Sequence, residues 1–326
     1  MGLSKEIIER HISEWERRLS QPPYPHRAKW PSNLFHHTPL DNAVRILRDG
    51  ELCSRLDSAN RRARDVAAPG VIDNRHHGHE CARLYFRPRT PTQYHIEGIR
   101  KLGECEYGDA AHAPVLFMLV FDAGAILGQS DVRFCDRNVQ LGSAVIGDRE
   151  DYFERIPFEK VFHVGDIRGD RSIIDHRCAE VLATSPMPLE GTFRRIICRS
   201  QAEAQTLAYA LGNDLRQWED RIVVSDDLGV FERRFAFFQE LGLSPQGVFW
   251  LLNVRNDGQP IKLSIRITDQ VGAQVASYDH HEFPARWPPQ RWLHNHPLPD
   301  GRYHVVATIE GHLAFESDID LGDTIF

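Results

Sequence analysis

The chain has 326 residues, of which 41% are hydrophobic and 26% charged, an ordinary balance for a globular protein. This length exceeds the usual range of one domain, so two domains are expected. The longest wholly apolar run, residues 115–121, is far shorter than the roughly 20 residues of a membrane helix, and the N-terminus lacks the apolar core of a secretion signal. The sequence argues against a membrane span and classical secretion.

Six scattered cysteines form no C-x-x-C pair, which favours reduced thiols in a cytoplasmic protein over a zinc knuckle or a disulfide framework. The charge is unevenly divided along the chain. Residues 1–212 hold 29 basic and 29 acidic residues, whereas residues 213–326 hold 10 and 17. The whole net charge of −7 thus lies in the C-terminal third, and we predict a domain boundary near residue 212.

The first predicted element is an amphipathic helix. Apolar residues recur at helical spacing from Ser4, which can serve as the N-cap, to Leu19. Residues 21–31 contain four prolines and cannot continue this helix. We expect residues 1–31 to form a helical appendage on a stiff linker.

A short strand and a second helix are predicted next. Residues 34–36 are strand-like, and Thr38 as N-cap with Pro39 at the first helical position indicates a helix that ends at Gly50. His36, at the end of the predicted strand, therefore lies at a strand-to-helix junction. Residues 55–83 are polar and rich in arginine, which predicts a long loop.

Strands and helices alternate up to residue 212. Ser200 and Glu203 form a capping box for the last of these helices, which ends at Gly212. The remaining predicted elements are strands at residues 84–86, 115–121 and 192–198 and a helix around residues 177–183.

After residue 212 the pattern changes to short strands separated by turns. Such runs cover residues 248–254, 261–267, 274–277 and 303–309. Several strands within about 100 residues are typical of an immunoglobulin-like β-sandwich. The sequence thus predicts an α+β chain in three parts, residues 1–31, 32–212 and 213–326.

Three groups of residues could carry chemistry, and each has an ordinary structural alternative. His36 could hydrogen-bond a ribose hydroxyl or a local carbonyl group. Aromatic and arginine residues in Tyr85–Pro91, with Tyr94, could hold a flat heterocycle and phosphates, or they could pack into the core. Glu180 lies in an apolar run, so it requires either a function or a partner such as Arg177.

We expect no metal site. His76, His77 and His79 lie in the polar loop without a carboxylate or cysteine at ligand spacing. The sequence also lacks a Gly-rich dinucleotide loop and a Walker loop, which argues against a Rossmann or P-loop nucleotide site.

The order of these groups resembles the DarT family of DNA ADP-ribosyltransferases. That family reads approximately aromatic-His-x-Thr with a following Asn, then Phe-Tyr-Phe-x-Pro-Arg-Ser-Pro-x-x-Tyr, then Phe-x-Asp-Arg, then Arg-x-Ala-Glu-x-Leu. The matching segments are Phe35–Asn42, Leu84–Tyr94, Phe134–Arg137 and Arg177–Leu182. The resemblance covers about residues 33–212, and the C-terminal strands are not part of the family core.

The resemblance implies an ADP-ribosyltransferase fold that cleaves NAD, its substrate, and attaches ADP-ribose to thymidine or guanosine in single-stranded DNA. It further implies a toxin or defence role controlled by an antitoxin macrodomain protein. Glu180 would be the catalytic carboxylate and Arg75 the essential loop arginine. The competing loop arginines are Arg61, Arg62 and Arg64. The implied NAD-binding residues are His36, Thr38, Asn42, Tyr85 and Tyr94, and the implied nucleic-acid contacts are Arg87, Arg89 and Arg137.

The chemistry agrees with these residues. Cleavage of the nicotinamide–ribose bond develops positive charge at the anomeric carbon, and a carboxylate such as Glu180 would stabilise it. The same group could take the proton of the attacking base. Residues 45–100 hold 11 arginines and 7 acidic residues, and positive charge with interleaved aromatic rings suits a single strand.

Two departures from the family leave alternatives open. Ala82–Arg83 stand where the family usually has Val-Pro. The acidic C-terminal part would repel a nucleic acid backbone, so it could bind another protein, position the substrate or only extend the fold. The acceptor could thus be RNA or protein. The third hypothesis, a non-catalytic nucleic-acid-binding module, is disfavoured by the retained His36, Tyr94 and Glu180.

Overall fold

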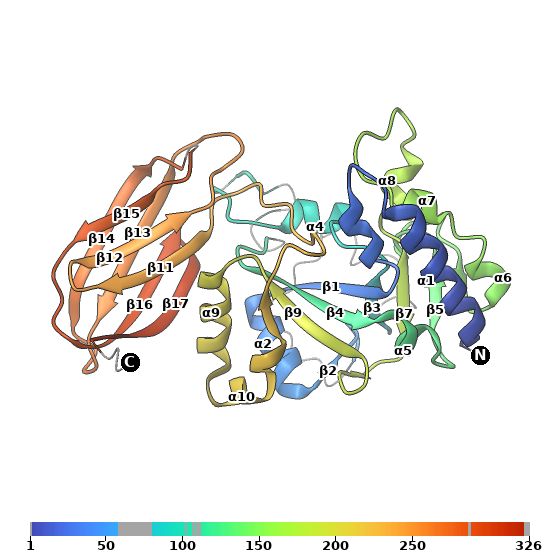
Figure 1. Ribbon diagram of the computed structural model, residues 1–326, viewed down its shortest axis with the longest axis horizontal. Helices are drawn as coiled ribbons and strands as arrows, with labels where there is room; N and C mark the ends of the chain where they lie inside the picture. Colours follow the sequence, from blue (N-terminus) through green and yellow to red (C-terminus); the bar gives the residue numbers. More distant parts are fainter. Residues whose placement is uncertain are drawn as a thin grey trace. The chain divides into compact units, whose positions relative to one another are not determined.

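The computed structural model describes residues 2–57, 80–101, 103–105, 108, 112–285 and 288–322. The chain divides into two compact units, each made of segments that lie far apart in the sequence (Figure 1). Unit 1 comprises Met1–His95, Phe117–Ile197 and Ser225–Phe231. Unit 2 comprises Ile96–Leu116, Cys198–Val224 and Glu232–Phe326, so the boundary predicted near residue 212 falls inside it.

The strands that unit 1 contributes to the main sheet lie in the order β9-β4-β1-β3-β7-β5-β6. β7 pairs antiparallel with β3 on one side and with β5 on the other. The strands are β1 (Asn33–Pro39), β3 (Ala82–Tyr85), β4 (Leu116–Asp122), β5 (Arg133–Cys135), β6 (Ile146–Gly147), β7 (Glu180–Ala183) and β9 (Phe193–Cys198), and a separate small sheet pairs β2 (Glu51–Leu52) with β8 (Met187–Pro188). The predicted strands at 84–86, 115–121 and 192–198 are confirmed within one or two residues.

Short helices accompany this sheet. They are α1 (Lys5–Leu19), the 3-10 helix η1 (Pro25–Lys29), α2 (Leu40–Asp49), α4 (Pro91–Ile96), α5 (Ala123–Leu127), α6 (Glu150–Phe153), α7 (Phe158–Val161) and α8 (Ser172–His176). The predicted start of α2 is wrong by one residue, because Thr38 and Pro39 are the last residues of β1 and Pro39 occupies the N-cap. Its end at Gly50 is confirmed, with the left-handed φ of 70° that glycine accepts without strain.

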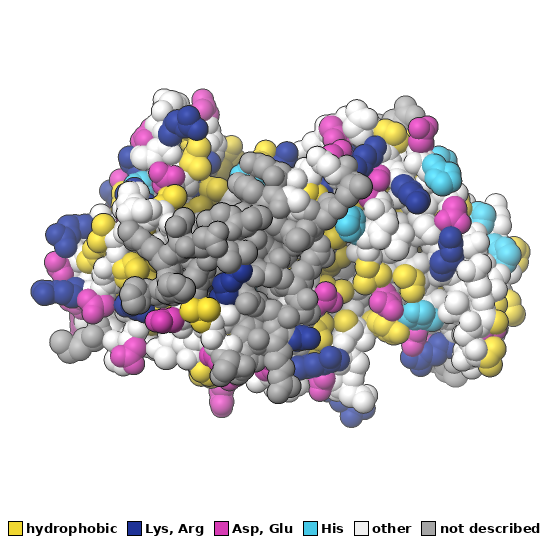
Figure 2. Space-filling model, turned by 180° about the vertical axis from the view of Figure 1, so that it is seen from behind, with side chains coloured by type: hydrophobic (Ala, Val, Ile, Leu, Met, Phe, Trp, Pro, Cys, Tyr) yellow, Lys and Arg dark blue, Asp and Glu magenta, His cyan; other side chains and the backbone are white. Residues whose placement is uncertain are grey.

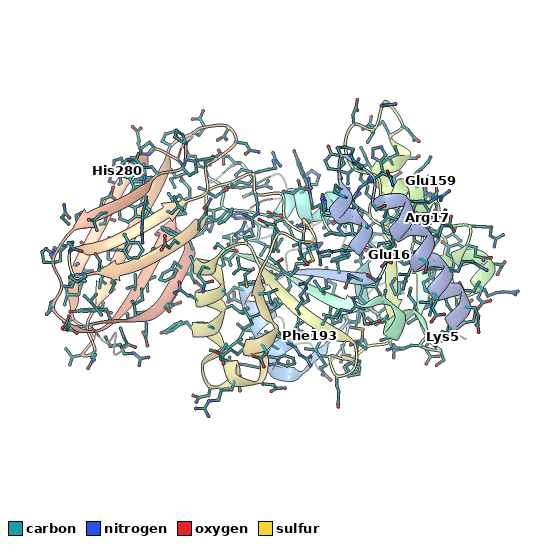
Figure 3. All side chains as sticks on the ribbon, viewed as in Figure 1. Lys5, Glu16, Arg17, Glu159, Phe193 and His280 are labelled. Atoms are coloured by element: carbon teal, nitrogen blue, oxygen red, sulfur yellow. The ribbon has the colours of Figure 1, made fainter. Side chains whose placement is uncertain are left out.

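The N-terminal helix is an integral part of unit 1 and not the predicted appendage. The Trp15 ring lies 5.5 Å from the ring of Phe162, and the Leu3 N–H donates to the Leu127 carbonyl at 3.0 Å. Polar residues such as Lys5 and Arg17 occupy the exposed face of α1 (Figure 3). Packing of the apolar face therefore fixes the helix, while Ser4, the N-cap, makes no side-chain capping bond.

A buried histidine on α1 predicts that the protein loses stability in acid. His11 packs 4.9 Å from Phe153 and 4.3 Å from Phe158, and burial lowers its pKa to about 3. Since the unfolded chain binds this proton near pH 6.5, His11 costs stability as the pH falls from 6.5 toward 3, about 2 kcal/mol at pH 5. Urea unfolding at pH 7.5 and pH 5 should show a smaller acid loss for His11→Leu than for the wild type. His281→Leu, at an exposed position, is the control, and equal losses in all three proteins would contradict the prediction.

The helix predicted around residues 177–183 is wrong. Glu180–Ala183 form the strand β7, and all four residues are buried between β3 and β5. A short apolar run that is buried on both faces lacks the periodicity that separates strand from helix, and its neighbours in the sheet decide its structure.

Unit 2 contains a β-sandwich. One sheet has the order β11-β12-β15 and the other the order β14-β13-β16-β17, and their inner residues, such as Trp250 and Ile265, share one core. The strands are β11 (Phe238–Ser244), β12 (Gly247–Leu252), β13 (Ile261–Thr268), β14 (Gln274–Phe283), β15 (Arg291–Asn295), β16 (Gly301–Ile309) and β17 (His312–Leu321). The sequence analysis missed β11, β15 and β17.

On the face that Figure 2 shows, acidic and basic side chains are interspersed over the described surface.

The helix predicted after Ser200 belongs to the same unit as the sandwich. α9 (Gln201–Leu211) starts as expected, because the Ser200 hydroxyl accepts from the Glu203 N–H at 3.2 Å. Its residue Ala202 is part of the core of the sandwich, and Thr206 Oγ1 accepts from the Glu316 N–H of β17 at 3.1 Å. The elements that follow are η4 (Gly212–Asp214), α10 (Leu215–Trp218), η5 (Glu219–Arg221) and β10 (Ile222–Val224).

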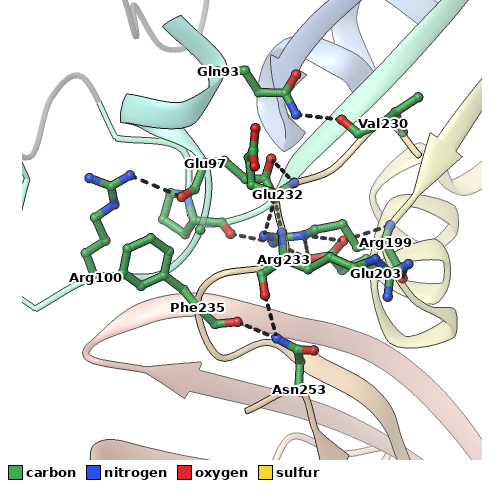
Figure 4. A network of polar contacts seen from close by, with 12 residues as sticks. Gln93, Glu97, Arg100, Arg199, Glu203, Val230, Glu232, Arg233, Phe235 and Asn253 are labelled. Carbon is green, nitrogen blue, oxygen red and sulfur yellow. Dashed lines mark hydrogen bonds and ion pairs between the residues drawn. The ribbon is translucent and has the colours of Figure 1, made fainter. Parts of the chain in front are cut away.

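A buried charge network joins the segments of unit 2 (Figure 4). The side chains of Arg199 and Glu203 form an ion pair, and each is only 1% exposed. Glu97 accepts hydrogen bonds from the Glu232 and Arg233 N–H groups at 3.0 and 3.1 Å. The Arg233 guanidinium donates to the Arg199 carbonyl at 3.0 Å. The polar groups of all three segments thus depend on one another for hydrogen bonds.

Candidate active site

The site is built on a row of residues across the main sheet. Tyr85 of β3 lies directly opposite Glu180 of β7, and Glu180 lies opposite Cys135 of β5. Phe35 of β1 lies opposite Tyr85. Because directly paired residues of antiparallel strands project to the same face, the register brings these four side chains together.

Glu180 is fully buried, with 0% of its surface exposed. Its Oε1 accepts from the Arg83 guanidinium, and its Oε2 accepts from the Val139 N–H at 2.9 Å. The partner suggested by the sequence, Arg177, instead donates to the carbonyl oxygens of His163 and Gly165 at 3.1 and 2.8 Å. Both oxygens of the carboxylate are thus held by donors, as a charged group in a buried position requires.

His36 is oriented by the strand that carries Arg83. Its Nδ1–H donates to the Arg83 carbonyl at 3.0 Å. Burial lowers the pKa of His36, and the Arg83 charge lowers it further, against the effect of this hydrogen bond. The ring is therefore neutral at pH 7, and Nε2 is left as a hydrogen-bond acceptor.

Neutral groups surround the ion pair. The His37 ring stacks on Tyr85 at 5.3 Å and 10°, and burial lowers the His37 pKa to about 3. Burial and the Glu180 charge raise the pKa of the Tyr85 hydroxyl, which hydrogen-bonds Thr92. The same two causes raise the pKa of Cys178 to about 12. These groups keep one protonation state between pH 5 and 9.

The remaining predicted NAD-binding residues lie on neighbouring elements. Thr38 is 3% exposed at the end of β1, and Asn42 lies partly buried in the first turn of α2. Tyr94 is on α4 and is 41% exposed. The structure thus brings His36 and Tyr85 to the Arg83–Glu180 pair, whereas Tyr94 is exposed on a helix.

The predicted nucleic-acid arginines have different surroundings. Arg87 is 3% exposed, and it donates to the Val161 carbonyl at 3.1 Å and to the His163 carbonyl while it stacks over a tryptophan ring, so it lies in the core. Arg89 is partly buried with φ of 56°. The Arg137 side chain is 21% exposed and pairs with Asp136 at 2.8 Å, two residues before the Val139 N–H that contacts Glu180.

Several predicted residues lie outside the described part of the chain. They are Arg75, the competing Arg61, Arg62 and Arg64, and the loop histidines His76, His77 and His79.

Among the described residues, no group of three His, Cys, Asp or Glu side chains could hold a metal ion. Within the same residues, every helix is too short or too polar to span a bilayer.

The sequence analysis missed three contributors to this site. They are the Arg83 guanidinium and the Val139 N–H, which hold Glu180, and the His37 ring, which stacks on Tyr85. A signal existed for Arg83, because it stands at a position where the resembling family usually has proline. The strand register then gives it a partner 97 residues away.

Comparison with known families identifies this class of site. The chain matches the family "ssDNA thymidine ADP-ribosyltransferase, DarT" over residues 35–227, more than half of its length. The chain therefore belongs to the DarT family, as predicted. It is an ADP-ribosyltransferase that uses NAD as its substrate and modifies single-stranded DNA.

Solved structures of DarT proteins are similar to this chain. DarT of Thermus sp. 2.9 in complex with ADP-ribosylated ssDNA is 20% identical, with a TM-score of 0.48, over 61% of this chain and 96% of that chain. The same protein in complex with NAD+ gives 20% identity and a TM-score of 0.45, over 61% and 97%. DarTG of Thermosipho africanus in complex with ADP-ribose has 20% identity and a TM-score of 0.41, over 64% of this chain and 52% of that chain. No curated protein matches the chain.

Proposed function

We propose that Glu180 is the catalytic carboxylate and that the acceptor is thymidine. The observation that carries this proposal is a buried carboxylate held by an arginine and a backbone N–H, on a sheet face shared with Tyr85. A fixed negative charge in a dry site stabilises the cation that develops when the nicotinamide–ribose bond breaks. Glu180 could then accept the proton of the attacking base nitrogen.

The neighbouring residues would hold NAD. Nε2 of His36 is an acceptor, so it would receive a hydrogen bond from a ribose hydroxyl. Thr38 at the end of β1 and Asn42 on α2 are close to it in sequence. The Tyr85 ring would face the nicotinamide, and the exposed Tyr94 is the alternative. Arg75 remains our proposal for the loop arginine.

We propose Arg137 and Arg89 as contacts of the DNA strand. Arg137 precedes the loop residue whose N–H holds Glu180, so a strand bound there would run past the reacting centre. The hydrogen bonds that it donates to Asp136 raise its pKa, and it therefore keeps its charge at all relevant pH values. Arg87 is assigned to the core instead, because its guanidinium donates to buried carbonyl groups.

The test is incubation with NAD labelled in the adenylate part and with separate acceptors. The acceptors are oligo-dT and oligo-dG single strands, oligo-U RNA and a mixture of proteins. Label on oligo-dT alone is the expected result. Label on oligo-dG would change the base, and label on RNA or protein alone would contradict DNA as the acceptor of this chain.

Replacing His36 should weaken NAD binding. His36→Ala removes one neutral hydrogen bond, and we expect the free energy of NAD binding to fall by about 0.5–1.5 kcal/mol. Calorimetric titration of NAD measures the loss. His37→Ala, which removes only a stacked ring, is the matched control and should lose less. The reverse order would mean that His37 is the ribose ligand.

The biological setting follows from the resemblance of the chain. We propose a toxin or defence protein of the cytoplasm, whose DNA mark an antitoxin macrodomain protein removes. We further propose that the β-sandwich is immunoglobulin-like and that it binds a protein partner or positions the substrate. Its interspersed charges on the face in Figure 2 suit a polar protein surface better than a nucleic acid backbone.

A further inference from the structure

Arg83 is placed by the sheet to act on Glu180. It lies on β3 opposite Leu182, two residues before Tyr85, so its side chain shares the face of the catalytic row. Its guanidinium donates to Glu180 and reaches Asn138 Oδ1 at 3.4 Å. The side chain is 22% exposed, whereas its carboxylate partner is fully buried.

The reaction needs the negative charge of Glu180, and burial opposes that charge. A carboxyl group taken out of water without a cation tends to hold its proton. The Val139 N–H supplies a hydrogen bond but no charge. Among the described groups, Tyr85, Cys135 and Cys178, whose pKa values burial and the Glu180 charge raise, remain neutral. His36 and His37 lie beside Arg83, and their lowered pKa values keep them neutral too.

We propose that Arg83 is a positioning residue that keeps Glu180 ionised and aimed through their buried ion pair. This inference rests on the proposed role of Glu180. This orientation leaves one donor of Arg83 unsatisfied. Its Nε is buried without a hydrogen-bond partner among the described residues, although buried donors are normally paired. The guanidinium is oriented toward the carboxylate at that cost.

The alternative is an arginine that only stabilises the fold. Arg133 of β5 provides the comparison, because it also lies opposite Leu182, on the other side of β7. Its guanidinium donates to the Cys81 thiol at 2.9 Å instead of to a carboxylate. Arg133→Gln therefore removes an arginine from the same sheet without touching the charge of Glu180.

The experiment measures kcat and KM for NAD from pH 5 to pH 9 with saturating single-stranded DNA. For Arg83→Gln, we expect kcat at pH 7 to fall at least about tenfold, with KM changed less than about threefold. The loss should shrink as the pH approaches 9, because the carboxyl group then ionises without help. Arg83→Lys and the control Arg133→Gln should both keep the wild-type dependence of kcat on pH at the acidic end of this range.

A second measurement does not depend on activity. In full-length protein labelled with 13C at glutamate carboxyl groups, the Glu180 resonance is the one missing from Glu180→Gln. Its titration midpoint should lie higher in Arg83→Gln than in the wild type. An unchanged midpoint in a folded variant, or an equal loss of kcat at all pH values, would overturn the proposal for Arg83. A wild-type protein that modifies no acceptor would instead contradict the proposed function, and the NMR titration would still test the ion pair.

Discussion

Glu180→Gln should reduce ADP-ribose transfer at least about 10³-fold, a loss of about 4 kcal/mol of transition-state stabilisation. The substitution removes both the charge beside the developing cation and the proton acceptor. The amide oxygen can still accept from the Val139 N–H or from Arg83, so the sheet should stay folded and NAD should still bind. Transfer of label to oligo-dT, circular dichroism and calorimetry with NAD together measure the effect.

Glu203→Gln is the matched control. Glu203 is another carboxylate that lies buried against an arginine, but in unit 2. Breaking that pair should cost about 3–5 kcal/mol of stability, because the buried charge of Arg199 loses the closer of its two carboxylate partners and keeps only Glu97 at 4.0 Å. The folded fraction of this variant should keep wild-type turnover. Full activity of Glu180→Gln would remove Glu180 from the mechanism.

A chain that ends at Asn213 should fail to fold. It keeps Glu97 but loses the N–H groups of Glu232 and Arg233, which donate to Glu97. It also keeps Arg199 but loses the Arg233 guanidinium, which donates to the Arg199 carbonyl. It also uncovers Ala202, which the core of the sandwich covers. Leaving buried charges without partners costs several kcal/mol, a large part of the roughly 5–15 kcal/mol that stabilises a domain.

Expression of the truncated and full chains side by side tests this expectation. The truncated chain should be insoluble or should lack a cooperative urea transition. If it were soluble and unfolded at the same urea concentration as the full chain, the sandwich would be a separate module, in accordance with the three-part division predicted from the sequence. If it were soluble but inactive, part of the site would lie in the C-terminal third.

Local signals in the sequence predicted many elements of the fold. The amphipathic spacing after Ser4 gave α1, and the capping box at Ser200 gave α9 within a residue. The apolar run at 115–121 gave β4. Signals of this kind involve residues a few positions apart, so they can be recognised without knowledge of the rest of the chain.

Features that depend on distant residues could not be predicted in the same way. The four-residue run at Glu180 is a strand because β3 and β5 flank it, and the run has no hydrophobic periodicity from which a strand could be predicted. The motifs pointed to His36 and Glu180, but the pairing of Glu180 with Arg83 requires the register of two strands. The hydrogen bond from the Arg233 guanidinium to the Arg199 carbonyl likewise joins segments that lie far apart in the sequence.

Two buried thiols close to Glu180 offer a probe of how often the sheet opens. Cys135 and Cys178 are 0% and 6% exposed, and burial raises the pKa of each to about 12. An alkylating reagent attacks the thiolate, so both should react only during transient opening of the strands around Glu180. Their labelling rate, divided by that of the same thiol in denaturant, measures the free energy of local opening. NAD that binds this face should slow it.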